Sequence, residues 1–219
     1  MAHLIPIPVL VVSVILLVRA RFRSDIRQEY VFKTISTLLV IVVALLSLLV
    51  PSARPSYTLW IALGLVLSLG GDLSLVSSSD RLFRVGLVLF LLAHVVYSIA
   101  FTAPSGFHPQ DLVTGAILLV LGIGIYVYLR PGMGRMGGPV ALYILVICFM
   151  VNRAVSTFFG TAFSLAQAWL VTIGAFLFWV SDLLLAINRF RKPLRAAPLG
   201  LLLYYAGQLL IALSPSYFA

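Results

Sequence analysis

The chain has 219 residues, of which 62% are hydrophobic and only 10% charged, and its formal net charge is +9. A soluble domain carries about 25% charged residues, so this composition excludes an ordinary globular enzyme and predicts an all-α polytopic membrane protein. In such a protein an excess of basic residues reports the orientation of the helices, and we expect no nucleic-acid partner.

Eight apolar segments follow one another along the chain, and each is about long enough to cross a ~30 Å hydrocarbon core. They cover residues 4–19, 31–50, 57–77, 84–102, 111–129, 139–157, 165–188 and 198–214. The connections are short and rich in Pro, Gly, Ser and Arg, so neighbouring helices should be antiparallel within one membrane domain, residues 1–219. No Lys or Arg precedes the first segment, so we expect a retained helix rather than a cleaved signal peptide.

The distribution of basic residues predicts the orientation of the helices. Of the 15 Lys and Arg residues, 13 cluster at one end of the predicted helices, in residues 19–33, 81–84, 130–135 and 189–195. That end should be cytoplasmic, which places both termini on the opposite side. The other two are Arg54 and Arg153, and we expect Arg153 to extend its charge toward the membrane surface.

An internal repeat links the two halves of the chain. "GLVLSLGGDLSL" from Gly64 matches "GAFLFWVSDLLL" from Gly174, and "GLVLFLLAHVVY" from Gly86 matches "GLLLYYAGQLLI" from Gly200. Both members of the first pair have Asp eight positions after Gly, followed by Leu-x-Leu. The matches predict two parallel four-helix repeats, 1–105 and 106–219, related by an axis along the membrane normal.

Two carboxylates interrupt the apolar segments, and they are the strongest functional candidates. At 1.5 Å per residue, Asp72 and Asp182 lie ~9 and ~10 Å from the basic ends of their helices. Neither has an obvious cationic partner at its depth. Two carboxylates in one low-dielectric pocket cannot both ionise cheaply, so we expect a shared proton, with one group as general acid and the other as base. The alternative is that each separately holds helices together through hydrogen bonds.

Other polar residues at membrane depth are weaker candidates. His94 shares a helix face with Tyr97, and it either serves the carboxylates or is a hydrogen-bonded packing residue. Tyr204 and Gln208 also share a face, which suits substrate contact and interhelical hydrogen bonding equally. Tyr143 lies near the basic end of its segment, as a site residue or an interfacial anchor.

Several other chemistries lack the residues that they need. Only one of the three histidines is deep in a segment, and Cys148 is the single cysteine, so neither a multi-ligand zinc site nor a disulfide is expected. There is no G-x-S-x-G nucleophile motif and no phosphate-binding loop, and we expect no cofactor. Gly70 and Gly71 predict a close helix approach beside Asp72.

The motifs "GDLSL", "FLLAHVVY", "GAFLFWVSDLLLA" and "YYAGQLLI", in this order on eight helices, resemble the YhhN-like family of membrane lysoplasmalogenases. "PVALYILVICFMVNRA" is similar to the family's segment on the sixth helix, and the resemblance runs from about the second segment to the end of the chain. It implies hydrolysis of the vinyl ether bond of lysoplasmalogen to a fatty aldehyde and a glycerophospho-base. It also implies Asp72, His94 and Asp182 as the catalytic centre.

The resemblance makes a lysophospholipid the expected substrate and the lipid bilayer the expected environment. We expect its tail between apolar helices and its head group near Arg81, Arg84 and Arg189. The substrate-binding candidates are therefore Tyr97, Tyr143, Tyr204, Gln208, Arg84 and Arg189. The compact loops and basic clusters favour a bacterial inner membrane. The competing hypotheses are a proton-coupled transporter of a small lipophilic or lipid substrate, and a scaffold protein.

Overall fold

The computed structural model describes residues 2–77, 79–195 and 197–218; Met1, Ser78 of the serine-rich connection, Ala196 and Ala219 lie outside these ranges. The described residues form eight long α-helices joined by short turns. They are α1 (Ile7–Phe22), α2 (Ile26–Leu46), α3 (Pro55–Val76), α4 (Asp80–Ser105), α5 (Gln110–Leu129), α6 (Gly137–Ser156), α7 (Leu165–Phe190) and α8 (Gly200–Leu213). Together with the short 3₁₀ turns that extend some of them, all eight are long and apolar enough to cross a membrane. The prediction of an all-α membrane protein with eight spanning helices is confirmed.

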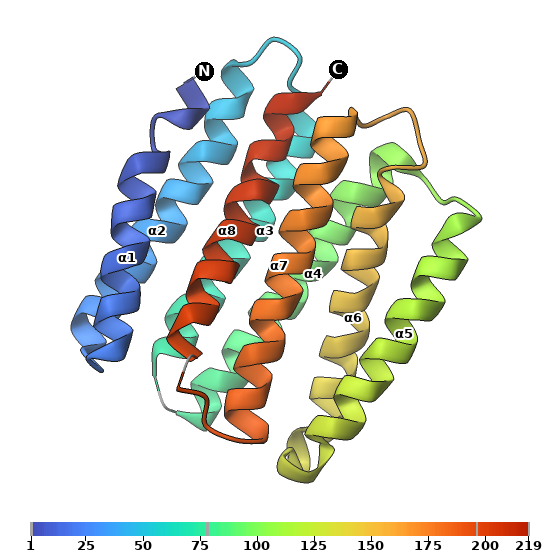
Figure 1. Cartoon of the computed structure of the whole chain (residues 1–219). Helices are drawn as coiled ribbons and strands as arrows, with labels where there is room; N and C mark the ends of the chain where they lie inside the picture. Colours follow the sequence, from blue (N-terminus) through green and yellow to red (C-terminus); the bar gives the residue numbers. More distant parts are fainter. Residues whose placement is uncertain (1, 78, 196, 219) are drawn as a thin grey trace.

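Six of the helices form a closed ring. Around it, α2 packs on α3, α3 on α4, α4 on α6, α6 on α7, α7 on α8, and α8 returns to α2. The remaining two helices lie at opposite edges of the molecule, α1 against α2 and α5 against α6 (Figure 1). The core therefore lies inside the ring, where residues from both halves of the chain meet.

The packing order of α1 to α4 recurs in α5 to α8. In each half the first helix packs on the second, the second on the third and the third on the fourth, and the fourth helix of each half contacts the second helix of the other. Parallel four-helix repeats would produce this pattern. It supports the duplication into 1–105 and 106–219, which stays a prediction.

Both termini lie at the same end of the bundle (Figure 1). An even number of antiparallel helices requires this. The connections that carry the basic clusters lie at the other end, which is termed the basic end.

The start of α2 differs from the prediction, with a consequence for the site. The helix begins at Ile26 rather than at residue 31, because the Asp25 side chain caps it by accepting a hydrogen bond from a first-turn amide. Glu29 therefore also belongs to the helix, Lys33 lies about two turns inside it rather than at its start, and both are buried. Lys33 is part of the protein core rather than of a basic loop.

Glycines bring the helix backbones close at two places. A Cβ atom on Gly207 in α8 would lie 2.7 Å from the carbonyl oxygen of Gly174 in α7. A Cβ atom on Gly71 in α3 would lie 2.6 Å from the Phe90 ring in α4. Such distances leave no room for a methyl group, so the prediction of close packing at Gly71, beside Asp72, is confirmed.

Arg153 does not extend to the membrane surface, and that expectation is wrong. Its side chain is fully buried and forms an ion pair with Asp111, with Nη1 2.6 Å from Oδ2. Nε donates to Thr102 at 3.0 Å, and Nη2 donates to the Gly106 carbonyl oxygen. Asp111, in the first turn of α5, provides a partner that periodicity does not reveal, and the pair joins α4, α5 and α6 at the end opposite the basic clusters.

Candidate active site

Asp72, on the last turns of α3, is enclosed by donors from α2 and α8. Its Oδ2 atom accepts hydrogen bonds from the hydroxyls of Thr37 and Tyr204, both at 2.8 Å. The Lys33 ammonium lies 3.7 Å from Oδ1 and donates to the Asp72 carbonyl oxygen at 3.3 Å. The expectation that Asp72 has no cationic partner is therefore wrong. The early start of α2 places Lys33 at the depth of the carboxylate.

Further polar groups contact Tyr204 and Thr37 on the side away from Asp72 and orient their hydroxyls. Gln208 donates to the Tyr204 hydroxyl at 3.1 Å and accepts from Tyr97 at 2.9 Å. The Tyr205 hydroxyl lies 3.1 Å from that of Thr37. Because the Tyr204 hydroxyl accepts a hydrogen bond from Gln208, its own O–H is oriented toward Asp72. Tyr97 and Gln208, predicted to bind substrate, are instead buried behind Tyr204 and do not line the pocket that contains Asp72.

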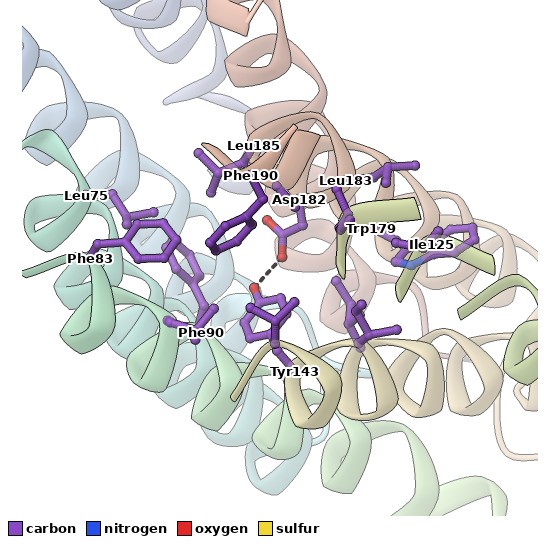
Figure 2. A pocket seen from close by; sticks show the side chains of 16 residues that line it. Leu75, Phe83, Phe90, Ile125, Tyr143, Trp179, Asp182, Leu183, Leu185 and Phe190 are labelled. Carbon is purple, nitrogen blue, oxygen red and sulfur yellow. Dashed lines mark hydrogen bonds between the residues drawn. The ribbon is translucent and has the colours of Figure 1, made fainter. Parts of the chain in front are cut away.

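Asp182, on α7, has a different set of neighbours. Its Oδ2 atom accepts a hydrogen bond from the Tyr143 hydroxyl of α6 (Figure 2). His94 of α4 places Nε2 3.9 Å from the same oxygen. The structure thus places Tyr143 and His94, two of the candidates, beside Asp182, and Asp182 has no Lys or Arg within ion-pairing distance among the described residues.

His94 has unmet hydrogen-bonding capacity. Its side chain is fully buried, and neither ring nitrogen has a hydrogen-bond partner among the residues that the structure describes. Edge contacts hold the ring, with centroid distances of 4.8 Å to Phe178 and 5.3 Å to Tyr143. Because an unpartnered buried nitrogen is costly, this ring is well placed to bond a water molecule or a substrate atom.

The two carboxyl groups line one pocket. Asp72 and Asp182 both line a space between α2, α3, α7 and α8. Counted from the observed helix ends, Asp72 lies about one turn and Asp182 about two turns deep, so the depths are less equal than predicted. Both nevertheless line the same pocket, as a divided acid–base pair requires.

Two pockets that differ in polarity share Asp182 in their linings. The first, the apolar pocket, is formed by side chains of α3 to α7, and Figure 2 shows the Asp182 carboxylate among them. Its lining includes Phe83, Phe90, Ile125, Leu129, Tyr143, Trp179 and Phe190. The second, the polar pocket, contains Asp72 and Lys33 together with Arg21 and Glu29. Both pockets include Asp182, so this carboxyl group lies on the boundary between them.

The predicted head-group arginines lie outside both pockets. Arg84 and Arg189 are exposed at the basic end, and neither lines the apolar or the polar pocket. Arg189 forms an ion pair with Asp80 and stacks its guanidinium 4.7 Å from the Phe83 ring centre. Arg21 of α1, which sequence reasoning counted only toward orientation, lines the polar pocket instead.

One signal in the sequence anticipates Lys33. Lys33 precedes Asp72 by 39 positions, and Tyr143 precedes Asp182 by the same 39 positions. In each half, therefore, the second helix supplies a donor to the carboxylate of the third helix from a repeat-equivalent position. Extending the repeat to the second and sixth segments would have found both donors.

Metal binding has no support from the side-chain arrangement. In residues 2–77, 79–195 and 197–218, no three His, Cys, Asp or Glu side chains come together as a metal site requires.

Comparison with known proteins gives consistent matches. The model of the YhhN family matches residues 28–215. The bovine protein "Lysoplasmalogenase TMEM86A" is 35% identical over 70% of the chain and 64% of its own length. The human "Lysoplasmalogenase TMEM86B" is 37% identical over 75% of the chain and 67% of its own length. The Dictyostelium discoideum "Lysoplasmalogenase homolog" is 26% identical over 97% of the chain and 77% of its own length. The chain thus spans less than two thirds of the bovine relative, and no solved structure matches it significantly.

Proposed function

The chain belongs to the YhhN family, and we propose that it is a lysoplasmalogenase-like hydrolase that cleaves the vinyl ether bond of a lysoplasmalogen. The names of the bovine, human and Dictyostelium relatives support the reaction class. The structural observation that carries the proposal is the position of Asp182, beside Asp72, where the apolar pocket meets the polar pocket. A lysolipid has its vinyl ether bond at the same kind of boundary, between an aliphatic tail and a polar head.

The two pockets suggest how the substrate lies. The part of the aliphatic tail next to the vinyl ether occupies the apolar pocket, against aromatic side chains such as Phe83 and Trp179. The vinyl ether bond then lies beside Asp182, and the glycerol enters the polar pocket beside Asp72. Tyr143 lines the apolar pocket and Tyr204 lines the polar pocket, so each flanks the reacting bond from one side.

The neighbours of the two carboxyl groups assign their roles. Asp72 faces the Lys33 ammonium and accepts two hydroxyl hydrogen bonds, so its charged form has more stabilising partners than the charged form of Asp182. Asp182 has one phenol donor and borders the apolar pocket, an environment that favours the protonated form. Asp182 is accordingly the general acid and Asp72 the base.

These roles account for each proton in the reaction. Asp182 transfers its proton to the alkene carbon that is not bonded to oxygen, which leaves an oxocarbenium cation facing the Asp72 carboxylate. Water adds to the cation and gives a proton to Asp72, forming a hemiacetal. The hemiacetal hydroxyl returns a proton to Asp182, the bond to the glycerol oxygen breaks, and Asp72 protonates that oxygen. Paired carboxylates in glycosidases divide acid and base roles in the same way.

His94 is the candidate to hold the attacking water. Its Nε2 atom is 3.9 Å from Asp182 Oδ2 and has no partner within the described chain. His94 lines neither pocket, so it would hold this water from behind the Asp182 carboxyl group, and the burial of the ring would exclude other water.

Substitution of each carboxylate tests the proposal. Asp72→Asn and Asp182→Asn should each reduce aldehyde release at least ~10²-fold, because an amide neither donates an acidic proton nor accepts one. The measurement is aldehyde release from lysoplasmalogen by purified protein in detergent, with thermal unfolding recorded to verify folding. Asp80→Asn is the matched control, since Asp80 is exposed and outside both pockets.

The same assay separates the hydrolase from a transporter, because transport requires sealed vesicles and hydrolysis does not. Full activity of Asp72→Asn or Asp182→Asn would contradict the carboxylate mechanism. A folded wild-type protein that releases no aldehyde would contradict the hydrolase itself.

We also propose that the basic end faces the cytoplasm of a bacterial inner membrane. The support is the clustering of basic residues at the connections of that end, which is the usual determinant of orientation. The head group would then enter the polar pocket from the cytoplasmic leaflet. Single cysteines placed at positions 24 and 52 of a Cys148→Ser background and labelled with a membrane-impermeant reagent check this, since only Ser52→Cys should react from outside the cell.

A further inference from the structure

An ion pair in the polar pocket has no part in the proposed reaction. Arg21 at the end of α1 donates through Nη1 to both carboxylate oxygens of Glu29 in α2, at 3.1 and 2.9 Å. The Glu29 side chain is 3% exposed and that of Arg21 is 40% exposed. Both line the pocket that contains Asp72 and Lys33. The polar pocket thus has a positive and a negative group side by side, near the basic end of the helix bundle.

The burial of Glu29 is costly for a merely structural contact. Removing a carboxylate from water carries a penalty of several kcal/mol that a well-packed apolar side chain avoids. The Arg21 guanidinium donates to Glu29 through Nη1 alone, so its Nε and Nη2 atoms take no part in the ion pair. A ligand phosphate can bind those two donors without breaking the ion pair, since Arg binds phosphate in a bidentate manner.

The position of the pair relative to the apolar pocket identifies the ligand chemistry. The vinyl ether oxygen joins the aliphatic chain to glycerol, so a tail in the apolar pocket and a bond at Asp182 direct the rest of the lipid into the polar pocket. The charged part of that lipid is a phosphate ester followed by an ammonium group. Arg21 matches the phosphate and Glu29 matches the ammonium.

We infer that Arg21 and Glu29 form a head-group subsite that selects a zwitterionic phosphoester over an uncharged head group. The inference rests on the proposed function for the orientation of the lipid. Its effect belongs to binding rather than to chemistry, because neither residue is placed next to the reacting bond.

The test compares two substrates and several variants. The substrates are alkenyl-glycerophosphoethanolamine and alkenylglycerol, which lacks the phosphate and the base. Arg21→Gln should raise KM for the phosphoester about tenfold, as loss of a charged hydrogen bond does. It should leave kcat, and KM for alkenylglycerol, within about twofold of wild type. Arg23→Gln is the matched control, because Arg23 is an exposed basic residue of the same turn and does not line the pocket.

Two further variants separate recognition from folding. The exchange Arg21→Glu/Glu29→Arg keeps an ion pair between α1 and α2 and should keep the thermal stability, yet KM for the phosphoester should stay raised. Arg21→Gln/Glu29→Gln removes both charges without leaving one buried alone, and should show the same raised KM. An unchanged ratio of KM values between the two substrates in these variants would overturn the subsite, while the proposed function would stand.

A binding measurement covers the case in which no substrate is cleaved. The saturated alkyl analogue of the phosphoester has no vinyl ether and cannot react, so its Kd reports recognition alone. Arg21→Gln should weaken this Kd about tenfold relative to the Arg23→Gln control. A wild-type protein that binds the analogue but releases no aldehyde would contradict the hydrolase and keep the subsite; equal Kd values would overturn the subsite.

Discussion

At the scale of single residues, the two halves of the site differ in one donor. Lys33 and Tyr143 occupy equivalent positions, 39 residues before their aspartates. Lys33 places an ammonium beside Asp72, and Tyr143 donates a phenol hydroxyl to Asp182. Two carboxyl groups in related surroundings thereby become unequal, which an acid and a base require.

Lys33 is therefore predicted to position the charge of Asp72 without touching the substrate. Lys33→Met should lower kcat for aldehyde release on the order of 10²-fold, since Asp72 then lacks the cation that keeps it ionised. It should also destabilise the protein by about 3–5 kcal/mol, because one partner of a buried pair remains alone. Kinetics and thermal unfolding in detergent measure the two effects.

Two companion variants distinguish charge from packing at this position. Lys33→Met/Asp72→Asn leaves no unpaired charge, so it should regain most of the stability and none of the activity. Lys33→Arg keeps the positive charge and should regain part of the activity. Wild-type kcat in a folded Lys33→Met protein would show that the cation is dispensable.

At the scale of helices, the α7–α8 contact depends on the absence of two side chains. Gly207→Ala would place a Cβ atom 2.7 Å from the Gly174 carbonyl oxygen and 3.0 Å from the Phe178 nitrogen. We expect a loss of about 1–3 kcal/mol, since α8 must move away from α7. A lower Tm in detergent checks this.

Gly124 provides the comparison for that substitution, because nothing lies within 4 Å of a Cβ atom built there. Gly124→Ala should leave Tm unchanged or raise it slightly, through the higher helix propensity of Ala. Equal Tm values for the two variants would argue against a tight α7–α8 contact.

The helices are more predictable from the sequence than the contacts between them. Apolar length alone identifies all eight, because a spanning helix must satisfy its backbone hydrogen bonds internally. The role of Lys33 escapes prediction because a basic residue at the start of a predicted segment is counted with the basic cluster, until the cap at Asp25 shows that the helix begins about two turns before Lys33. The ion pair of Arg153 is not predictable from the sequence pattern because its partner, Asp111, lies on a different helix, in the first turn of α5. Thr37 gives no signal, since hydroxyl residues are common in apolar helices.

At the scale of the whole molecule, the site is shared between the halves. Tyr204 from the second half donates to Asp72 of the first, and His94 from the first half lies beside Asp182 of the second. The α4–α6 and α8–α2 contacts join the halves around the ring. Neither half alone therefore contains a complete set of groups.

Separate expression of residues 1–105 and 106–219 tests this division. Each fragment alone should release no aldehyde, and the two expressed together should copurify through a tag on one of them and recover part of the activity. Each fragment has four spanning helices, so the ends of each lie on one side of the membrane. Aldehyde release by either fragment alone would contradict a shared site.

The meeting of the apolar and polar pockets at Asp182 also affects the fate of the two products. With the proposed reaction at that boundary, each product is already in the compartment that suits it: the aldehyde among hydrocarbon-like side chains, the glycerophospho-base among charged ones. The two products then need no common exit. The aldehyde can diffuse sideways into lipid and its water-soluble counterpart into the aqueous phase, so accumulation of either should inhibit turnover independently of the other.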